Sequence, residues 1–506
     1  PFQVLLNHRY GIPPRLDALA ARLLTPETSR TTGAQDAFAD GTGNGAGERH
    51  SAPGADAPWT GGASVLMVDT GRLNGWVTRV AGTDPFDRIN AVSAAVCVSA
   101  ARALLEEAGT PLDAGDDPRV LIFAPYDAQA ELINRMIREA RLTWAVQAGT
   151  PETLQDAHAP YGVLDLVEDS PFSGGPMFRP SADAVTTRRL AGALARARRR
   201  LVIVGDVDHM EKRARGAVVG SRFMPALREL ATAVEVADLP PGQRIETAED
   251  PEQTPFLDVL AAEIRHAAAQ VVIYTPTIEM DSLKILKDAI QTAVEKGVRI
   301  YVITPPASAR RKKEAGVYQE MEGMLERWQV TMIPMLRMHE RLVWIDGRVL
   351  LLGSGDPLAS AASGGWGWRG GRAIADFMAR HLRINDLVSV HDGGRRPECP
   401  ICGSPIVAAA GRHWPFYWRC VEKGCYSRTI DQAPAAAERE PLRCARCRGE
   451  VEFGMWGGKP CWRCRSDRRH RQPIAKTHLT TPETAARIPA RERAKLLKAF
   501  GITPEP

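Results

Sequence analysis

The sequence predicts a multidomain α/β protein that ends in two small metal-binding modules. Two observations lead to this class. Short apolar runs alternate with segments of helical apolar spacing in two successive series, a pattern typical of parallel sheets covered by helices on both faces. Eight of the nine cysteines then lie between Cys399 and Cys464. With 506 residues, 44% hydrophobic and 25% charged, the chain is long enough for several domains.

Residues 1–240 form the first predicted domain. Its expected strands and helices, in alternation, are 64–68, 90–108, 120–123, 128–141, 163–167, 187–199 and 201–205. This order predicts a parallel sheet covered by helices on both faces. Residues 30–62 are rich in Gly, Ala, Asp and Ser and almost lack large apolar residues, so we expect a disordered insertion there.

A second α/β series occupies residues 250–392. The prolines and glycine at 240–242 and the acidic residues that follow mark the boundary before it. Helices are expected over 256–268, 282–296 and 316–328, and strands over 271–274, 298–303, 330–333, 341–345 and 349–352. The last two strands follow each other closely, which indicates a turn between them.

The cysteines form two sets of four with the spacing of metal ligands. The first set, in residues 397–430, is Cys399, Cys402, Cys420 and Cys425, and the second, in residues 440–470, is Cys444, Cys447, Cys461 and Cys464. Because zinc prefers four soft ligands and a CxxC turn supplies two, this spacing predicts two structural zinc ribbons. Disulfides are the alternative. The single remaining cysteine, Cys97, and the otherwise thiol-free chain suit a reducing cytoplasm and therefore favour metal.

Arginines and aromatic residues crowd the same cysteine-rich region. Arg412, Trp414, Trp418 and Arg419 are the candidates in the first ribbon. Arginine neutralises phosphate and aromatic rings stack on bases, so the pattern favours single-stranded DNA or RNA as partner. The alternative is that the arginines solubilise a small domain whose core the aromatics form. A basic tail, residues 471–506, follows with a helix expected over 481–500. No apolar run of about 18 residues occurs, so no membrane partner is expected.

Four segments of the first domain resemble, in family order, the second RecA-like domain of superfamily 1 helicases. They are LLNHRY at 5–10, APYDAQ at 124–129, GTPETLQDAH at 149–158 and RLAGALARA at 189–197. The resemblance implies that Arg9, Gln155 and Arg196 serve the nucleotide and that Thr150 contacts nucleic acid. In this family ATP binds between two RecA-like lobes. The sequence has no GxxxxGK[ST] loop, so ATP and magnesium are expected only with an upstream lobe that it lacks.

The same segments also depart from the helicase pattern. Asp156 and His158 stand where the family has Gly and Glu, and Ala191 and Ala195 replace its Asn and Thr. Loss of these polar groups would weaken the coupling between nucleotide and nucleic acid. A motor lobe that has lost its activity is therefore an open alternative.

Residues 339–347, followed by residues 353–356, resemble the HxK and GSxN signature of the phospholipase D superfamily. In that family an imidazole attacks phosphorus to form a phosphohistidine, and a cation two residues further along the same strand face holds the phosphate oxygens. The resemblance implies that His339 is the nucleophile, or the general acid when its twin attacks. Arg341 would hold the phosphate.

The remaining positions of this signature are Asp346, Ser354 and Asp356. Asp346 would orient a histidine or stabilise the local turn, while Ser354 and Asp356 occupy the positions of the family's Ser and Asn. Only one motif is present and a complete site needs two, so we expect a homodimer through this domain. Taken alone, His339 could also be an ordinary histidine at a strand end.

Taken together, the chain resembles the C-terminal part of a helicase-nuclease fusion, similar to Mokosh type II phage-defence systems, with a first ribbon like those of type I topoisomerases. We expect ATP-driven remodelling of nucleic acid coupled to phosphodiester cleavage, in DNA metabolism or phage defence. The main alternative is an inactive nucleic-acid-binding scaffold that acts through its ribbons. A lipid-acting phosphodiesterase is disfavoured, because no amphipathic membrane segment accompanies the site.

Overall fold

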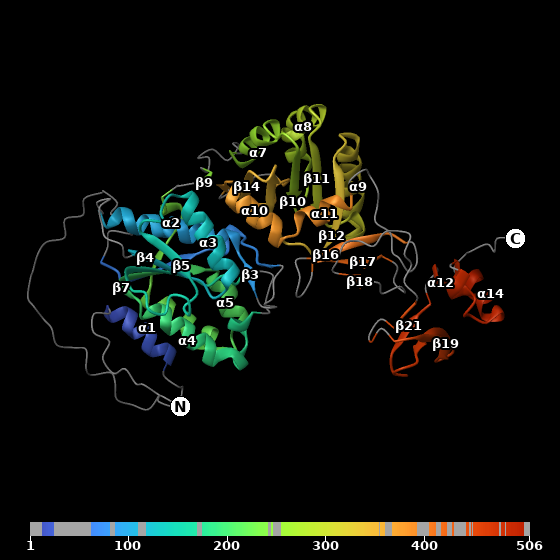
Figure 1. Cartoon of the computed structure of the whole chain (residues 1–506), viewed down its shortest axis with the longest axis horizontal. Coiled ribbons are helices and arrows are strands. Elements are labelled where there is room, and N and C mark those ends of the chain that lie inside the picture. The colour runs from blue at the N-terminus through green and yellow to red at the C-terminus, as the bar shows by residue number, and fades with distance from the viewer. Residues whose placement is uncertain are drawn as a thin grey trace, which may run out of the picture.

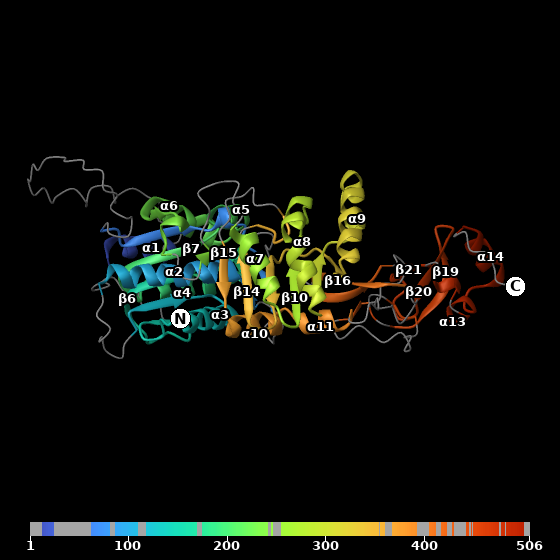
Figure 2. The same cartoon turned by 90° about the horizontal axis from the view of Figure 1, so that it is seen from above.

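Three lobes follow one another in a row in the computed structural model (Figures 1 and 2). The described residues are 13–24, 62–80, 87–109, 118–169, 175–240, 244–245, 255–353, 355–359, 367–391, 404–410, 416–421, 428–429, 442–444, 447, 449–474, 477–480 and 482–499. Arg9 lies outside them, and so does the expected insertion apart from Gly62. Among the described residues, no helix combines the length and the apolar character needed to cross a membrane.

The first lobe is built on a six-stranded sheet in the order β5-β4-β6-β7-β1-β8, in which every pairing is parallel. Its strands are β1 (Val65–Asp69), β4 (Val120–Phe123), β5 (Val146–Gly149), β6 (Ala159–Asp165), β7 (Ala197–Gly205) and β8 (Thr232–Val234). Two short strands, β2 (Thr78–Arg79) and β3 (Arg88–Ile89), pair separately. The predicted parallel α/β architecture is confirmed.

Helices cover both faces of this sheet because both sets of alternating strand side chains are apolar. On one side Leu66 and Val68 pack with α2 (Ala91–Glu107) and α3 (Asp127–Glu139). On the other side Leu121 and Phe123 pack with α1 (Pro14–Leu24), α4 (Asp183–Leu194), α5 (Val207–Arg213) and α6 (Met224–Leu230). The helix expected over 187–199 ends at Leu194, since the residues from Ala197 onward join β7.

A buried polar network fastens α2 and α3 to the end of β6. Asp165, with no exposed surface, accepts hydrogen bonds from Gln129 Nε2 (2.6 Å), Ser93 Oγ (3.2 Å) and the Val167 backbone N–H (2.9 Å). Asn90 caps α2 by accepting from the Ser93 backbone N–H at 3.1 Å. Burial raises the pKa of Asp165 to about 6, even though these donors oppose the shift.

The second lobe contains a ten-stranded mixed sheet in the order β18-β17-β16-β12-β11-β10-β13-β14-β15-β9. Its strands are β9 (Arg244–Ile245), β10 (Gln270–Tyr274), β11 (Arg299–Thr304), β12 (Thr331–Leu336), β13 (Leu342–Ile345), β14 (Val349–Gly353), β15 (Gly367–Gly370), β16 (Ile406–Ala410), β17 (Phe416–Cys420) and β18 (Arg428–Thr429). Strands β10 to β12 are parallel, whereas β13 and β14 form a hairpin. Asp346 and Gly347 make its turn with φ of 52° and 67°.

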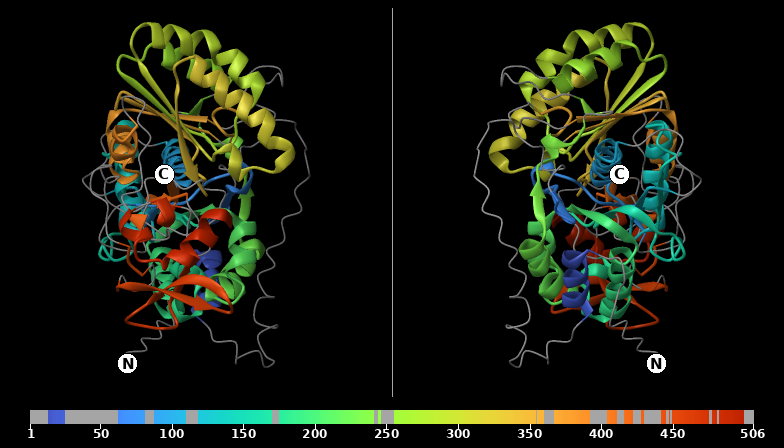
Figure 3. Two further views of the ribbon diagram at one scale, coloured as in Figure 1. Left: turned by 90° about the vertical axis from the view of Figure 1, so that its right-hand side faces the viewer. Right: turned by 90° about the vertical axis from the view of Figure 1, so that its left-hand side faces the viewer.

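The segment expected to form a separate first ribbon instead continues this sheet. Strand β16 pairs in parallel with β12, with Met335 opposite Ala408, and β17 pairs antiparallel with β16. Helices α7 (Pro255–Arg265), α8 (Met280–Glu295) and α9 (Lys312–Arg327) cover the sheet on the side away from the first lobe (Figure 3). Helices α10 (Arg372–His381) and α11 (Ile384–Ser389) lie on the other side.

Helix α10 joins the second lobe to the first by packing against α3. Buried side chains of both helices belong to one apolar cluster that extends from the first sheet to the second. Glu139 at the end of α3 accepts from the backbone N–H groups of Gly371 (2.6 Å) and Ile374 (3.3 Å) at the start of α10. Arg135 donates to the Ala373 carbonyl at 3.2 Å, and its guanidinium lies 5.3 Å from the centre of the Phe377 ring.

The third lobe is a three-stranded sheet followed by short helices. Its elements are β19 (Val451–Trp456), β20 (Lys459–Cys464), β21 (Arg471–Pro473), α12 (Thr477–Thr480), α13 (Pro482–Ala485) and α14 (Ala490–Ala499). The single helix expected over 481–500 is therefore wrong. Pro489 stands between α13 and α14, and proline in a helix interior removes a backbone hydrogen bond and clashes with the preceding turn.

Short helical turns connect the main elements. They are η2 (Gly71–Leu73), η3 (Pro176–Phe178), η4 (Pro180–Ala182), η5 (Val219–Phe223), η6 (Val236–Asp238) and η7 (Ala307–Ala309). Of these, η2 matters most for the site, because it directs the chain after β1 towards the second lobe.

The raised pKa of Asp165 predicts a pH dependence of stability. Because the folded-state pKa lies above the ordinary 3.8, the folded protein favours the protonated carboxyl. Stability from this group is fully present below pH 3.8 and is lost as the pH rises through about 6, by roughly 3 kcal/mol. In thermal unfolding, wild type should therefore lose stability relative to Asp165→Asn between pH 4 and 6.5. The exposed Asp281→Asn is the control, and a pH-independent difference would contradict the prediction.

Candidate active site and metal centre

The phospholipase D-like residues gather at one edge of the second sheet. Strands β10 to β12 run in parallel towards this edge, and His339 and Arg341 lie just beyond it, between β12 and β13. Since Leu342 of β13 pairs with Leu352 of β14, the residues before β13 and after β14 are neighbours. Asp356 follows β14 and is therefore brought to Arg341. Ser354 lies outside the described residues.

Arg341 forms a charge pair with Asp356. Its Nε lies 2.5 Å from Asp356 Oδ1, and the two side chains are 23% and 13% exposed. Its Nη1 also donates to the backbone carbonyl of Asn74, in the first lobe, at 3.1 Å. The guanidinium thus stands where a phosphate-binding cation is expected, but a carboxylate already compensates its charge.

His339 is half-buried beside this pair. Burial lowers the pKa of its imidazole, and the positive charge of Arg341 lowers it further, whereas the negative charge of Glu340 acts in the opposite direction. A pKa lowered in this way favours the neutral ring, which is the form that a nucleophile requires. The backbone N–H of His339 donates to Glu340 Oε2 at 2.9 Å.

Asp346 lies at the opposite edge of the sheet. The four residues of β13 separate it from the site, on the order of 13 Å at the usual strand rise. Its carboxylate accepts the backbone N–H groups of Ala268 (2.7 Å), Ala269 (2.9 Å) and Gln270 (2.8 Å). Burial alone would raise its pKa, but these donors outweigh that effect and lower it. Of the two roles expected for Asp346, the geometry supports the stabilisation of the turn.

In the first lobe the helicase-like segments meet around Arg196. Its Nε and Nη2 donate to the Gln155 carbonyl at 3.2 and 3.0 Å, so two expected nucleotide residues are in contact. Its Nη1 is buried and has no acceptor among the described residues. Burial lowers the pKa of Arg196, and the nearby carboxylates of Asp156 and Glu152 oppose this. Thr150 is buried and accepts from the Thr153 backbone N–H at 3.3 Å.

Four donor atoms gather in the third lobe in an arrangement that could hold a metal ion. They belong to Cys444, Cys447, Cys464 and His470, and all lie within 4.8 Å of one another. The sequence prediction gave the fourth place to Cys461. Cys461 and Cys464 are three positions apart on β20 and so point to opposite faces of the sheet, whereas His470 lies on the side of Cys464.

His470 also has the surroundings expected of a metal ligand. Its Nδ1 lies 3.8 Å from Cys444 Sγ, and its other ring nitrogen lies 3.5 Å from an Asp467 carboxylate oxygen. Metal-binding histidines commonly use one nitrogen for the metal and direct the other towards a carboxylate. Three thiolates and one imidazole form a closed tetrahedral donor set suited to a structural ion.

The first cysteine set is not gathered within the described residues. Cys420 lies buried on β17, and Cys399, Cys402 and Cys425 lie outside the described part of the chain. Arg412 and Trp414 also lie outside it. Metal binding by this first set of cysteines therefore stays a prediction from the sequence.

Trp418 cannot stack on a base in this structure. It is 1% exposed and packs edge-on against Phe416, at 5.7 Å between ring centres, and beside His391. Arg419, its neighbour, is half-buried and lines a cavity of about 460 Å³ against β12. An exposed aromatic surface occurs instead on the third lobe, where Trp456 is 61% exposed and the Arg471 guanidinium lies 4.6 Å from its ring centre.

Sequence reasoning missed four residues that contribute to these sites. They are His470, Glu340 and, in the first lobe, Asn74 and Thr78. A histidine six residues after Cys464 was a usable signal, because imidazole is a common zinc ligand. Nothing in the sequence marked the first-lobe residues, since they are more than 260 positions away from the motif that they contact.

Comparison with known families supports both halves of this description. Residues 55–208 match the family model described as an AAA domain, which is superfamily 1 helicase-like. Residues 260–356 match the model described as cardiolipin synthase, PLD-like domain. No curated protein matches the chain.

Solved structures similar to part of this chain include one described as a phospholipase D family member, Nuc from Salmonella typhimurium. NucT from Helicobacter pylori shares 14% identity over 26% of this chain and 87% of its own, with a TM-score of 0.21. Nuc from Salmonella typhimurium shares 14% over 26% and 86%, with a TM-score of 0.20. A phosphatidylserine synthase from Haemophilus influenzae Rd KW20 shares 15% over 28% and 36%, with a TM-score of 0.21. TM-scores this low carry no conclusion about function.

The chain therefore joins a segment that matches a helicase-like AAA domain to a segment that matches a phospholipase D-like domain. This is the domain combination of a helicase-nuclease fusion.

The metal centre makes a prediction that separates two neighbouring cysteines. Cys464→Ser removes a ligand of the gathered set, whereas Cys461→Ser leaves all four donors in place. Metal analysis by mass spectrometry should show the loss of about one ion per chain for Cys464→Ser and none for Cys461→Ser. Equal losses from both variants would favour the four-thiol set instead.

Proposed function

We propose that this protein binds single-stranded nucleic acid and cleaves its phosphodiester bonds at the second lobe, through a covalent intermediate on His339. The observation that carries the proposal is the meeting of His339, Arg341 and Asp356 at one sheet edge, next to a helicase-like lobe. The first lobe would act with an ATP-binding lobe that this sequence does not contain. Nucleic acid is favoured over lipid because of this neighbouring lobe.

The proposed cleavage of a phosphodiester bond has two steps. An imidazole nitrogen of His339 attacks phosphorus, the N–P bond forms, and the bond from phosphorus to the leaving oxygen breaks. A second imidazole protonates that oxygen, then takes a proton from water as the water attacks phosphorus and releases His339. Since the sequence has one such motif, a second copy of the chain would supply the second imidazole across a two-fold axis.

The third lobe would hold the strand. We propose structural zinc at Cys444, Cys447, Cys464 and His470, where it would fix the turn before β19 to the end of β20. The exposed Trp456 with the Arg471 guanidinium over it fits a stacking platform for a base and a contact for phosphate. A cytoplasmic setting, in DNA metabolism or phage defence, is proposed from the thiol usage and the resemblance alone.

A second candidate function is a nucleic-acid-binding scaffold without catalytic activity. The observation that favours it is the charge pair of Arg341 with Asp356, which leaves less positive charge for a substrate phosphate. A cleavage assay distinguishes the two functions, because only the first requires turnover of nucleic acid.

His339→Ala tests the cleavage. The purified protein should degrade single-stranded DNA or RNA without added Mg²⁺, and His339→Ala should reduce the rate by about 10³-fold or more because no nucleophile remains. His266→Ala is the matched control, since this exposed histidine lies near Asp346 at the opposite sheet edge. Binding without turnover in the wild type would favour the scaffold, and Mg²⁺-dependent cleavage that survives His339→Ala would reject the proposal.

Asp356→Asn should strengthen substrate binding. The asparagine matches the phospholipase D signature and removes the carboxylate that compensates Arg341. A partly exposed ion pair is worth about 1 kcal/mol, so KM for an oligonucleotide should fall by about five-fold. Asp376→Asn, an exposed change on α10, is the control. An unchanged or higher KM would show that Asp356 does not compete with phosphate.

A further inference from the structure

A short segment of the first lobe reaches the phosphodiesterase edge of the second. Residues 74–78, here termed the contact segment, follow η2 and make two hydrogen bonds to the phospholipase D-like motif. Thr78 Oγ1 donates to Glu340 Oε1 at 2.8 Å, and the Asn74 carbonyl accepts from Arg341 Nη1 at 3.1 Å. These contacts join parts of the chain that are more than 260 residues apart.

The Glu340 carboxylate is buried between the contact segment and the candidate nucleophile. Glu340 is 4% exposed and Thr78 is 2% exposed. One carboxylate oxygen accepts from Thr78, and the other accepts from the His339 backbone N–H at 2.9 Å. Because a buried carboxylate is costly without donors, both hydrogen bonds constrain where it lies. A single side chain therefore connects the first lobe to the backbone of His339.

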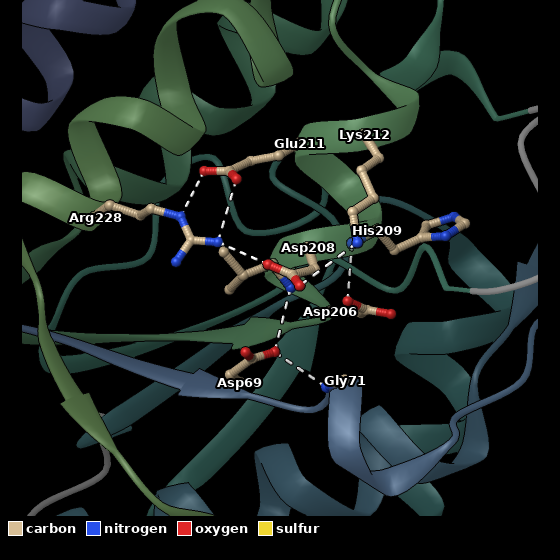
Figure 4. A network of polar contacts seen from close by, with 9 residues as sticks. Asp69, Gly71, Asp206, Asp208, His209, Glu211, Lys212 and Arg228 are labelled. Carbon is tan, nitrogen blue, oxygen red and sulfur yellow. Dashed lines mark hydrogen bonds and ion pairs between the residues drawn. The ribbon is translucent and has the colours of Figure 1, made fainter.

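The contact segment is itself held firmly. Asp69 at the end of β1 accepts from the backbone N–H groups of Gly71 (3.0 Å) and Val207 (3.3 Å), within the polar network at this end of the sheet (Figure 4). Gly75 packs so closely against the rest of the first lobe that a Cβ at this position would lie 2.1 Å from Asp169 Oδ2. Trp76 is fully buried. Because the contact segment is constrained in this way, it can hold the Glu340 side chain in a defined position.

We propose that Thr78 and Glu340 are positioning residues for the cleavage reaction, through which the first lobe sets the position of His339. The inference rests on the proposed function and adds to it a dependence of the cutting site on the neighbouring lobe. His339 and Arg341 are two residues apart and serve the phosphate, while Glu340 between them points to the first lobe. The reaction itself remains that of the imidazole, since neither Thr78 nor Glu340 touches the reacting atoms.

The charges around His339 make the pH dependence of cleavage a second test of the inference. Burial lowers the pKa of its imidazole, the negative charge of Glu340 raises it, and the positive charge of Arg341, which pairs with Asp356, lowers it. The Tyr274 hydroxyl is the other titratable group close to Glu340; burial and then that carboxylate raise its pKa, so it stays neutral. Removal of the Glu340 charge should therefore lower the pKa of His339.

The first experiment compares Thr78→Val with Thr78→Ser in the full chain. Valine keeps the shape but loses the donor to Glu340, whereas serine keeps the donor. Cleavage of a single-stranded oligonucleotide by Thr78→Val should show kcat lower by about 10- to 100-fold with KM within two-fold of wild type, as expected for a misplaced nucleophile. Thr78→Ser should restore kcat to within about three-fold. An equal loss in both variants, or full activity of Thr78→Val, would overturn the inference.

The second experiment uses Glu340→Gln, which keeps the volume of the side chain, and does not depend on the folding of Thr78→Val. Its acidic limb of kcat against pH should move to lower pH than that of wild type, because a neutral His339 forms earlier as the pH rises. An unmoved limb would also overturn the inference. His339→Ala separates the two proposals. If it retains wild-type cleavage, the proposed function fails; if it is inactive while Thr78→Val is fully active, only the positioning role fails.

Discussion

The packing of α3 against α10 holds the two large lobes together and fixes which residues of the first lobe lie beside the candidate active site of the second. Each sheet has an apolar face on this side, and their buried residues form one continuous cluster. Glu139 accepts hydrogen bonds from the backbone N–H groups of Gly371 and Ile374 at the start of α10. The N–H groups of a first helical turn have no carbonyl acceptor within their own helix, so this carboxylate supplies one. Either face alone would be exposed to water. The two lobes are therefore expected to fold and move as one unit.

This constraint explains why residues of the first lobe contact the candidate active site. With α10 fixed on α3, the end of β1 lies close to the loop before β13, and Asn74 and Thr78 reach Arg341 and Glu340. Each charged group there has a partner: Arg341 pairs with Asp356, and the buried Glu340 carboxylate accepts from two neutral donors. Such a site is stable without substrate. In the proposed reaction a substrate phosphate would replace Asp356 as the partner of Arg341, and this carboxylate would then influence affinity more than chemistry.

Local pattern predicted much of the fold and part of the site. Short continuous apolar runs indicated β1, β4 and β10, and the spacing of the phospholipase D-like signature indicated that His339, Arg341 and Asp356 lie at one end of the sheet, where the structure places them. Pairings that depend on distant partners were not predictable in this way, such as β16 with β12 or Thr78 with Glu340. The side chains of β17 alternate between buried and half-buried, so the sequence held a signal that Trp418 faces inward, but composition alone suggested a stacking surface.

The candidate metal site and the candidate phosphodiesterase site differ in how far a sequence can predict them, and the reason is physical. Ligands of a metal need only converge on one point, so a strand that offers Cys461 and Cys464 on opposite faces can contribute only one of them, and the next donor along the chain, His470, completes the set. A phosphodiesterase site needs an exact direction of attack as well as proximity. In the proposed reaction that direction would depend on the backbone of His339, whose N–H group donates to Glu340, while Glu340 also accepts from Thr78. Because both lobes share one apolar cluster, the contacts of Thr78 and Asn74 hold the residues around His339 in a defined place relative to the first lobe.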